Sequence, residues 1–438
     1  MSELSRLLER QIEIYRDKRP ESARLHREAQ SVLPGGNTRS VLFFEPFPPV
    51  MVRGEGCRLC DADGHGYLDA LGEFTAGLYG HSDPAIRAAI TEALQGGLSL
   101  SSHTVREAEL AREIQRRFPS LQLLRFTNSG TEANLMALAT ATAHTGRRKV
   151  LVFKGGYHGG VLAFAGGGSP VNVPHEWIVA RYNDLEDVHA RVAPHRGELA
   201  AILVEPMLGS GGCIAGEPDF LRGLRALADD CGALLIFDEV MTSRLSFGGR
   251  QALLGITPDL TTLGKYFGGG LSFGAFGGRS DVMARYDPRS SGAWQHAGTF
   301  NNNVLTMAAG LAGLTQVLTR ERLEALNARG DGLRTRLNAM FAREGVGLQV
   351  TGLGSLMQLQ VVAGAVTSSD DLAAGDDRLK ALLFFDLLER GIFMARRGLI
   401  ALSLPWDDAA CAELEQVLLD VVKARRDVLD VRALSALA

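Results

Sequence analysis

The chain has 438 residues, of which 46% are hydrophobic and 22% charged, and its formal net charge at pH 7 is −4. This length suits two domains, and a slightly negative chain without a basic block is a poor partner for nucleic acid or an anionic membrane. No apolar run approaches the ~20 residues that span a bilayer, and the charged N-terminal segment lacks the hydrophobic region of a signal peptide. We therefore expect a cytoplasmic protein that binds neither nucleic acid nor a membrane.

The cysteines indicate neither a disulfide framework nor a metal site. There are five of them, an odd and sparse set for a chain of this length. Cys57 and Cys60 have the spacing of metal ligands, but no second cysteine pair or histidine pair accompanies them. The sequence therefore predicts no metal, and we interpret both residues as small packing residues.

The N-terminal segment is predicted to be helical first and then to form hairpins. Residues 3 to about 31 carry apolar positions at helical spacing, and a Leu-Pro-Gly-Gly sequence ends the pattern at 33–36. Residues 50–71 alternate between apolar and polar around a turn-like Asp-Ala-Asp-Gly at 61–64. Such alternation is typical of short antiparallel strands.

From about residue 72 the chain alternates short apolar runs with helix-length segments. The runs lack polar alternation, which is typical of strands buried on both faces of a parallel sheet. The predicted strands are 123–127, 149–153, 177–181, 200–204, 234–237, 260–263 and 274–277, and the predicted helices are 83–95, 105–118, 131–144 and 217–231. This rhythm predicts a large α/β domain over residues 72–303, with a mostly parallel sheet covered by helices on both faces.

After Asn303 the chain is predicted to leave this domain. The predicted elements are a long helix to about 343, strands near 347–362 and 392–404, and a final helix near 407–426. We predict a smaller α+β domain made from both chain ends, with residues 1–71 as its N-terminal part and 304–438 as its C-terminal part.

Polar residues with chemical potential follow directly on several predicted strands. Asp238 ends the strand 234–237, and Lys265 follows the strand 260–263. In α/β sheets ligands collect just beyond the carboxyl ends of the strands. An isolated acid and an isolated lysine at such ends therefore indicate chemistry, and Glu205 marks a third strand end.

Other loops add the remaining parts of a cofactor site. Ser129, Gly130 and Thr131 open a predicted helix, whose N-terminus is suited to a phosphate. Tyr157 offers a flat aromatic ring, and Thr299 lies in a further loop. This inventory suits pyridoxal phosphate, because a lysine can hold its aldehyde covalently and a carboxylate can keep its ring nitrogen protonated.

The same motifs, in this order, carry a resemblance to a known family. They are Asn-Ser-Gly-Thr-Glu-Ala at 128–133, Gly-Tyr-His-Gly at 156–159, Glu-Pro at 205–206, Asp-Glu-Val at 238–240 and Gly-Lys at 264–265. Together they resemble the class III aminotransferases of fold type I over nearly the whole chain. The resemblance implies a pyridoxal-phosphate-dependent homodimer with shared active sites, formed by a large mostly parallel-sheet domain and a smaller α+β domain.

The resemblance also implies roles for individual residues. Lys265 would carry the cofactor and Asp238 would hold its ring nitrogen. The other implied cofactor residues are Ser129, Gly130 and Thr131 at the phosphate, Tyr157 and Val240 on the two ring faces, Glu205 near the cofactor, and Thr299 reaching across from the partner subunit.

Two arginine-containing segments point to the substrate class. Residues 34–41 and the Ala-Arg-Arg-Gly at 395–398 resemble the β-phenylalanine aminotransferases, in the branch that also holds glutamate-1-semialdehyde aminomutases. In those enzymes two arginines handle carboxylates, which implies Arg39 and Arg396 here, with the neighbouring Arg397 as the alternative to Arg396. Guanidinium groups at two distances can pair with two acids of different length.

Three phenylalanines after the first arginine segment have two possible interpretations. Phe43, Phe44 and Phe47 either form the wall of an aryl pocket or belong to the core of the smaller domain.

The sequence therefore predicts a transaminase that moves the amino group of a β-amino acid, aromatic like β-phenylalanine, to 2-oxoglutarate or pyruvate. An aminomutase, a racemase or another class III amine transaminase would use the same cofactor residues. A non-catalytic protein of the same fold is a distant alternative, which the intact Lys265 and Asp238 argue against. A nicotinamide dehydrogenase is disfavoured because no strand runs into a Gly-x-Gly-x-x-Gly turn.

Overall fold

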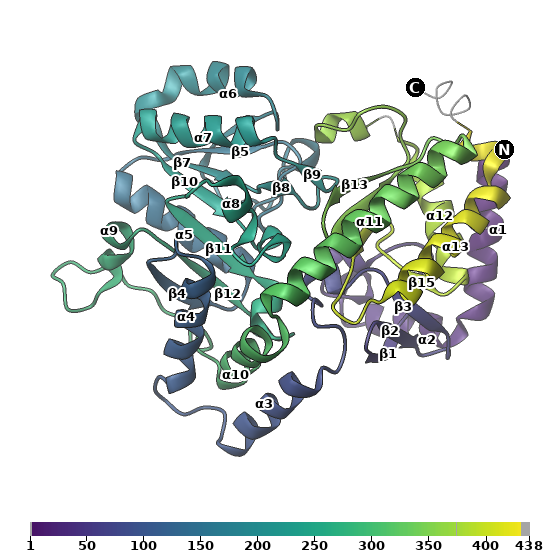
Figure 1. Cartoon of the computed structure of the whole chain (residues 1–438), viewed down its shortest axis with the longest axis horizontal. Helices are drawn as coiled ribbons and strands as arrows, with labels where there is room; N and C mark the ends of the chain where they lie inside the picture. Colours follow the sequence, from purple (N-terminus) through teal and green to yellow (C-terminus); the bar gives the residue numbers. More distant parts are fainter. Residues whose placement is uncertain (1, 374, 431–438) are drawn as a thin grey trace.

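A seven-stranded sheet lies in the left part of Figure 1 and forms the centre of the larger region of this computed structural model, which describes residues 2–373 and 375–430. Its strand order is β4-β12-β11-β10-β7-β5-β6. The strands are β4 (Leu123–Thr127), β5 (Lys149–Phe153), β6 (Glu176–Ala180), β7 (Leu199–Val204), β10 (Leu234–Asp238), β11 (Leu260–Gly264) and β12 (Gly274–Gly278). Strand β12 runs antiparallel to both of its neighbours, and the other pairings are parallel. The predicted mostly parallel sheet is confirmed.

Helices cover both faces of this sheet because its strands are apolar on both sides. Alternate residues of β7 and β10 pack into two different cores, one under α5 (Gly130–Thr145) and the other under α6 (Leu185–Val192) and α7 (Pro218–Cys231). The period of two along a strand sends neighbouring side chains to opposite faces. The remaining elements of this region are η3 (Glu73–Thr75), α3 (Pro84–Gln95), α4 (Val105–Arg117), η4 (Ala165–Gly167), η5 (Ala193–Glu198), β8 (Met207–Leu208), β9 (Ile214–Ala215), η6 (Thr242–Leu245), α8 (Gly249–Leu254), η7 (Lys265–Gly268), α9 (Ser280–Met283) and η8 (Ala284–Tyr286).

The two ends of the chain lie together at one side of this sheet (Figure 1). Strand β15 from the C-terminal part pairs in parallel with β3 in a four-stranded sheet, β1-β2-β3-β15. The elements here are α1 (Glu3–Lys18), α2 (Pro20–Gln30), η1 (Pro34–Gly36), η2 (Ser40–Leu42), β1 (Met51–Glu55), β2 (Arg58–Asp61), β3 (Gly66–Asp69), β13 (Gln349–Leu353), β14 (Leu356–Gln360), η10 (Ser369–Leu372), α12 (Asp377–Glu389), β15 (Ile392–Phe393), β16 (Leu399–Ala401), α13 (Asp408–Ala424) and α14 (Arg426–Leu429). The domain limits at residues 71 and 303 stay a prediction.

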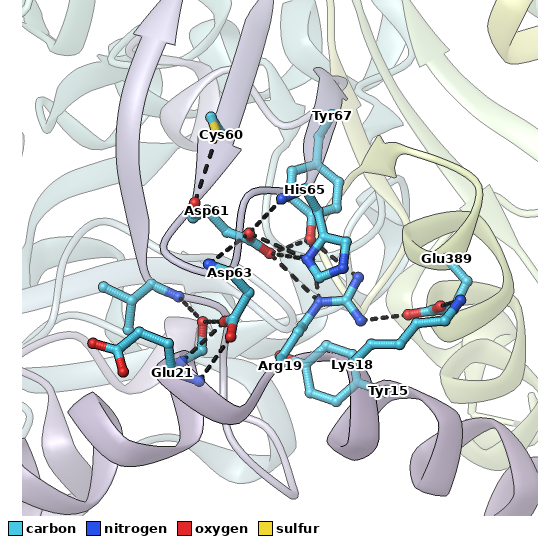
Figure 2. Close-up of polar contacts among 12 residues, drawn as sticks. Tyr15, Lys18, Arg19, Glu21, Cys60, Asp61, Asp63, His65, Tyr67 and Glu389 are labelled. Carbon is cyan, nitrogen blue, oxygen red and sulfur yellow. Dashed lines mark hydrogen bonds and ion pairs between the residues drawn. The ribbon is translucent and has the colours of Figure 1, made fainter.

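A buried polar network joins the chain ends (Figure 2). Arg19 is 1% exposed and donates from Nε and Nη2 to the hydroxyl of Tyr67, at 3.1 and 3.0 Å. The same guanidinium pairs with Glu389 at the end of α12, and the Tyr67 hydroxyl donates to Asp61 at 2.5 Å. A buried charge is costly unless it is paired and hydrogen-bonded, so these contacts hold α1, the β2–β3 hairpin and α12 in one arrangement.

Two helical predictions need correction. The pattern over residues 3–31 forms two helices, because Pro20 has no backbone N–H for the α1 ladder and starts α2 instead. The predicted long helix after Asn303 is α10 (Val304–Ala312), a π-helical turn η9 (Gly313–Val317) and then α11 (Arg320–Glu344), whose start is capped by Thr319. Within the described ranges, no helix combines the length and apolar character needed to cross a membrane.

Candidate active site

A pocket of about 650 Å³ lies beyond the carboxyl ends of β10 and β11. Side chains predicted from distant parts of the sequence meet in it, as expected for the strand ends of an α/β sheet. The predicted residues that line it are Arg39, Gly130, Thr131, Tyr157, Glu205, Asp238, Val240 and Lys265.

Asp238 is the buried acid of this pocket. Its Oδ2 accepts hydrogen bonds from Asn134 Nδ2 at 2.8 Å and from His158 Nδ1 at 2.7 Å, while Oδ1 accepts from the Val240 N–H at 3.0 Å. Asn134 is itself oriented, because its Oδ1 accepts from the Thr262 hydroxyl at 2.7 Å. These donors satisfy the oxygens of the buried carboxylate, as buried polar groups require.

Neither Asn134 nor His158 was predicted to belong to the site, although both contact Asp238. A signal for Asn134 existed: it lies one helical turn after Gly130 and Thr131, so it shares their face of α5. His158 stands within the Gly-Tyr-His-Gly motif. Its buried ring, 3% exposed, contacts Asp238 from the loop after β5.

Lys265 combines a strained backbone with a buried amine. Its φ is +59°, in the left-handed region that few non-glycine residues occupy, and such strain clusters at functional sites. Burial lowers the pKa of its amine to about 8, against the counteracting charge of Asp238. Its Nζ donates to the Phe74 carbonyl at 2.6 Å. A larger fraction of this amine is therefore neutral near pH 8 than for an ordinary lysine.

The N-terminus of α5 forms the polar end of the pocket. Ser129 caps this helix, accepting from the Glu132 N–H at 3.1 Å, and Gly130 and Thr131 face the cavity behind it. The free backbone N–H groups and the helix dipole favour an anion there. Gly159 packs against the same end at φ +130°, and a Cβ on it would lie 2.3 Å from Thr131 Oγ1.

Val240 and Tyr157 give the pocket two apolar surfaces. Val240 lies close to two glycines: a Cβ on Gly130 would be 2.9 Å from the Val240 side chain, and a Cβ on Gly264 would be 3.1 Å from it. Tyr157 is 47% exposed, and its backbone N–H donates to Glu205 at 2.9 Å. A flat group could fit between such surfaces.

Glu205 is a second buried acid of the pocket. Its two oxygens accept from the backbone N–H groups of Tyr157 and Gly209, each at 2.9 Å. Burial nevertheless raises the pKa of the carboxyl to about 7, and the nearby Asp238 charge acts in the same direction. Burial therefore favours the protonated form of this carboxyl, against the effect of His158 and the two backbone donors.

The second arginine that lines the pocket is Arg397, which was the alternative to Arg396. Arg397 lines the cavity, whereas Arg396 is exposed outside it. The two neighbours point in different directions because they lie in a tight turn, closed by the Gly398 N–H on the Ala395 carbonyl at 2.8 Å. Burial lowers the pKa of Arg397, and its Nε has no hydrogen-bond partner within the described part of the chain.

Phe74, which was not predicted to belong to the site, connects both arginines. The guanidinium carbons of Arg39 and Arg397 lie 5.3 and 5.2 Å from the centre of its ring, distances at which cations are attracted to an aromatic face. No motif in the sequence marked this residue, because its position depends on a turn with left-handed φ from Gly72 to Thr75.

The remaining candidates lie outside this pocket. Thr299 is exposed on its own chain, and Ser129 stands behind the pocket as a helix cap. Phe44 and Phe47 pack in the core against Tyr15, and Phe43 is 40% exposed. Phe44 and Phe47 therefore belong to the core, whereas Phe43 belongs neither to that core nor to the lining of this pocket. Within the described residues no group of three or more histidine, cysteine or acidic side chains could hold a metal ion.

Comparison with known proteins agrees with this geometry. The family described as aminotransferase class-III matches residues 44–406. The chain is 57% identical over 395 residues to the beta-phenylalanine transaminase of Variovorax paradoxus, covering 90% of this chain and 91% of the relative. It is 38% identical over 401 residues to a glutamate-1-semialdehyde 2,1-aminomutase of Desulforudis audaxviator (strain MP104C), covering 87% and 92%. The solved structure of a β-phenylalanine aminotransferase from Variovorax paradoxus superposes with a TM-score of 0.96 at 53% identity, covering 98% of this chain and 99% of the other.

Proposed function

The chain belongs to the class III aminotransferase family, and from this premise we propose that it transfers the amino group of a β-amino acid, aromatic like β-phenylalanine, to 2-oxoglutarate or pyruvate. The predicted resemblance, fold type I and the aminotransferase activity are confirmed. Enzymes of this family use pyridoxal phosphate and take an amino donor and a keto acid in turn. The observation that carries the substrate proposal is the pair of guanidinium groups, Arg39 and Arg397, on one phenylalanine ring.

The residues of the pocket fit pyridoxal phosphate. A buried carboxylate, Asp238, a buried amine of lowered pKa, Lys265, and a helix N-terminus at Gly130 face one cavity. The glycines allow close approach, since a Cβ at Gly159 would collide with Thr131. When bound, pyridoxal phosphate supplies an electron sink that makes the proton on the amino-bearing carbon acidic.

The protein's own groups then have separate tasks in the proposal. Asp238 keeps the ring nitrogen protonated, and His158 and Asn134 hold its carboxylate in place. Lys265 holds the cofactor and moves the proton to and from the substrate carbon as acid and base. Gly130 and Thr131 would bind the phosphate at the helix N-terminus that Ser129 caps. Tyr157 and Val240 would contact the two ring faces, and Glu205 would fix the Tyr157 backbone.

In the same proposal Arg39 and Arg397 bind substrate carboxylates. A guanidinium can bind a carboxylate with two parallel hydrogen bonds, which fixes the acid in orientation as well as in place. The free Nε of Arg397 is a buried donor that such an acid would satisfy. Arg397 replaces Arg396 in this role because Arg396 does not reach the cavity.

We also propose a cytoplasmic homodimer in which Thr299 reaches the pocket of the partner subunit. Its neighbour Phe300 is 62% exposed, and Leu98 and Leu100 are about half exposed, which gives the single chain apolar surface that a partner could cover. Light scattering of the purified protein tests the dimer, and a fully active monomer would contradict it. Fractionation of cells tests the location.

A panel of amino donors tests the substrate class. β-Phenylalanine, β-alanine, α-phenylalanine and the aryl amine α-methylbenzylamine are compared by kcat/KM, each with 2-oxoglutarate and with pyruvate. We expect β-phenylalanine to give the highest value, because its carboxylate and aryl group both find partners. A higher kcat/KM for α-phenylalanine or for the amine would overturn the proposal. The 38% identical aminomutase makes the intramolecular reaction the second candidate, and turnover of a donor without any keto acid would favour it.

A further inference from the structure

The two arginines of the pocket differ in their partners. Arg39 forms an ion pair from Nη1 to Oε1 of Glu73, whereas no acidic side chain within the described residues forms an ion pair with Arg397. Side-chain exposure differs as well: Arg39 is 45% exposed and Glu73 57% exposed, while Arg397 as a residue is only partly exposed. Arg39 is thus already occupied by a carboxylate of the protein itself, whereas Arg397 is free to bind the carboxylate of a substrate.

The backbone fixes Glu73 beside Arg39. Gly72, Glu73, Phe74 and Thr75 have φ values of +53°, +48°, +52° and +79°, a run of left-handed conformation that is costly for non-glycine residues. Buried contacts maintain it: Arg244, 1% exposed, donates to the Thr75 carbonyl at 3.2 Å. Lys265 donates to the Phe74 carbonyl from the other side. The Arg244 contact does not involve the cofactor, so the turn that places Glu73 beside Arg39 is held by the buried protein itself.

The Glu73 side chain itself is easily displaced. An ion pair with both members half exposed is weak in water, because solvent screens the attraction and two long side chains must be held in one geometry. A substrate carboxylate that enters the pocket can form the same hydrogen bonds to Arg39. The displaced Glu73 carboxylate can return to water without losing any other hydrogen bond or ion pair within the described part of the chain.

We propose that Glu73 is a specificity-determining residue whose carboxylate occupies the Arg39 guanidinium until a substrate carboxylate displaces it. This inference rests on the proposed carboxylate-binding role of Arg39. The Arg39 guanidinium then pairs with Glu73 when the bound substrate has no carboxylate at this place. It pairs with the substrate when the substrate has one. Arg397 has no such internal competitor and stays available for the second acid.

The Glu73→Gln variant of the holoenzyme tests the competition. Removing the internal anion should lower the KM for the carboxylate substrate bound by Arg39 about two- to fivefold, the range that corresponds to an exposed ion pair. The inhibition constant for 3-phenylpropionate, which has the carboxylate but no amine, should fall by the same factor, with kcat within twofold. The KM for α-methylbenzylamine, which has no carboxylate, should stay unchanged.

Two further variants separate competition from general charge or structural effects. Glu55→Gln removes the same charge from an exposed acid on β1 that pairs with Arg53 at 3.8 Å and does not line the pocket, and it should change none of these constants. In an Arg39→Gln background, Glu73→Gln should have no further effect on the carboxylate constants, as a double-mutant cycle requires.

Each alternative result is decisive. Unchanged carboxylate constants in Glu73→Gln would overturn the proposal, since Glu73 would then not compete for Arg39. Raised constants would overturn it too, since Glu73 would then orient Arg39 for the substrate. An equal change for α-methylbenzylamine would also overturn it. Binding of 3-phenylpropionate, followed by absorbance of the bound cofactor, needs no turnover. A wild-type enzyme inactive with β-phenylalanine would therefore refute the proposed substrate while leaving the Glu73 measurement intact.

Discussion

His158 Nδ1 lies 2.7 Å from Oδ2 of Asp238, and both side chains are buried at the end of β10. The contact connects the loop after β5 with the strand end that carries the acid. It leaves Oδ1 of Asp238 with only the Val240 N–H as a protein donor within the described residues. The free side of this oxygen can face a protonated ring nitrogen, so the histidine fixes the orientation in which the acid acts.

Asp238→Asn should lower kcat about 10²- to 10³-fold. The change removes the negative charge opposite the ring nitrogen, and breaking a buried ion pair costs about 3–5 kcal/mol, at about 1.4 kcal/mol for each tenfold in rate. Steady-state kinetics with saturating cofactor measure the loss. His158→Gln should cost less, because Asn134 and the Val240 N–H still hold the carboxylate. An Asp238→Asn enzyme with wild-type kcat would contradict the proposed role.

Reconstitution of the apoenzyme should report the lowered pKa of Lys265. The neutral amine is the nucleophile, so the rate of covalent cofactor binding should rise with pH and level off above about pH 8. With an ordinary lysine, whose pKa is about 10.4, this rate would keep rising with pH well above pH 8. Stopped-flow absorbance between pH 6 and 10 gives the midpoint. Lys265→Ala should show no covalent binding at any pH, and a midpoint near 10 would mean that burial does not shift this amine.

Arg397→Ala should raise the KM for a carboxylate substrate about 10- to 100-fold, because a hydrogen bond to a charged group contributes about 1.5–3 kcal/mol. Arg396→Ala is the matched control, since its side chain is exposed next to the same turn and lies outside the pocket. Its KM values should stay within twofold of the wild type. The opposite ranking of the two variants would restore Arg396 as the anchor.

Gly159→Ala should weaken cofactor binding about tenfold or more. A Cβ there would lie 2.3 Å from Thr131 Oγ1, and the φ of +130° is unfavourable for alanine by about 1–3 kcal/mol. The loop must therefore move away from the helix N-terminus that receives the phosphate. Gly197→Ala is the control, because nothing lies within 4 Å of its Cβ position and it does not line the pocket. Equilibrium titration of both apoenzymes with pyridoxal phosphate measures the difference, and equal dissociation constants would refute the steric argument.

The sequence by itself determined the central sheet and the ends of its strands. Strands 123–127 and 149–153 match the structure residue for residue, because an apolar run bounded by polar residues is a local signal of a buried strand. Asp238 and Lys265 were found for the same reason, since each follows such a run. Family motifs added the helix N-terminus at Gly130, which is again a local feature of the chain.

Only the tertiary structure decided the arrangement at the pocket mouth. Arg396 and Arg397 are adjacent arginines, and the sequence does not say which of them faces the pocket. The direction of each side chain depends on the turn closed by Gly398. Phe74 reaches both arginines through a left-handed turn held by Arg244, a residue far away in the chain. Periodicity reports which residues are buried, but the direction of a side chain in a turn depends on backbone angles that distant packing imposes. For that reason the chemistry could be predicted from the sequence, while the way the pocket handles its substrate acids could be seen only in the fold.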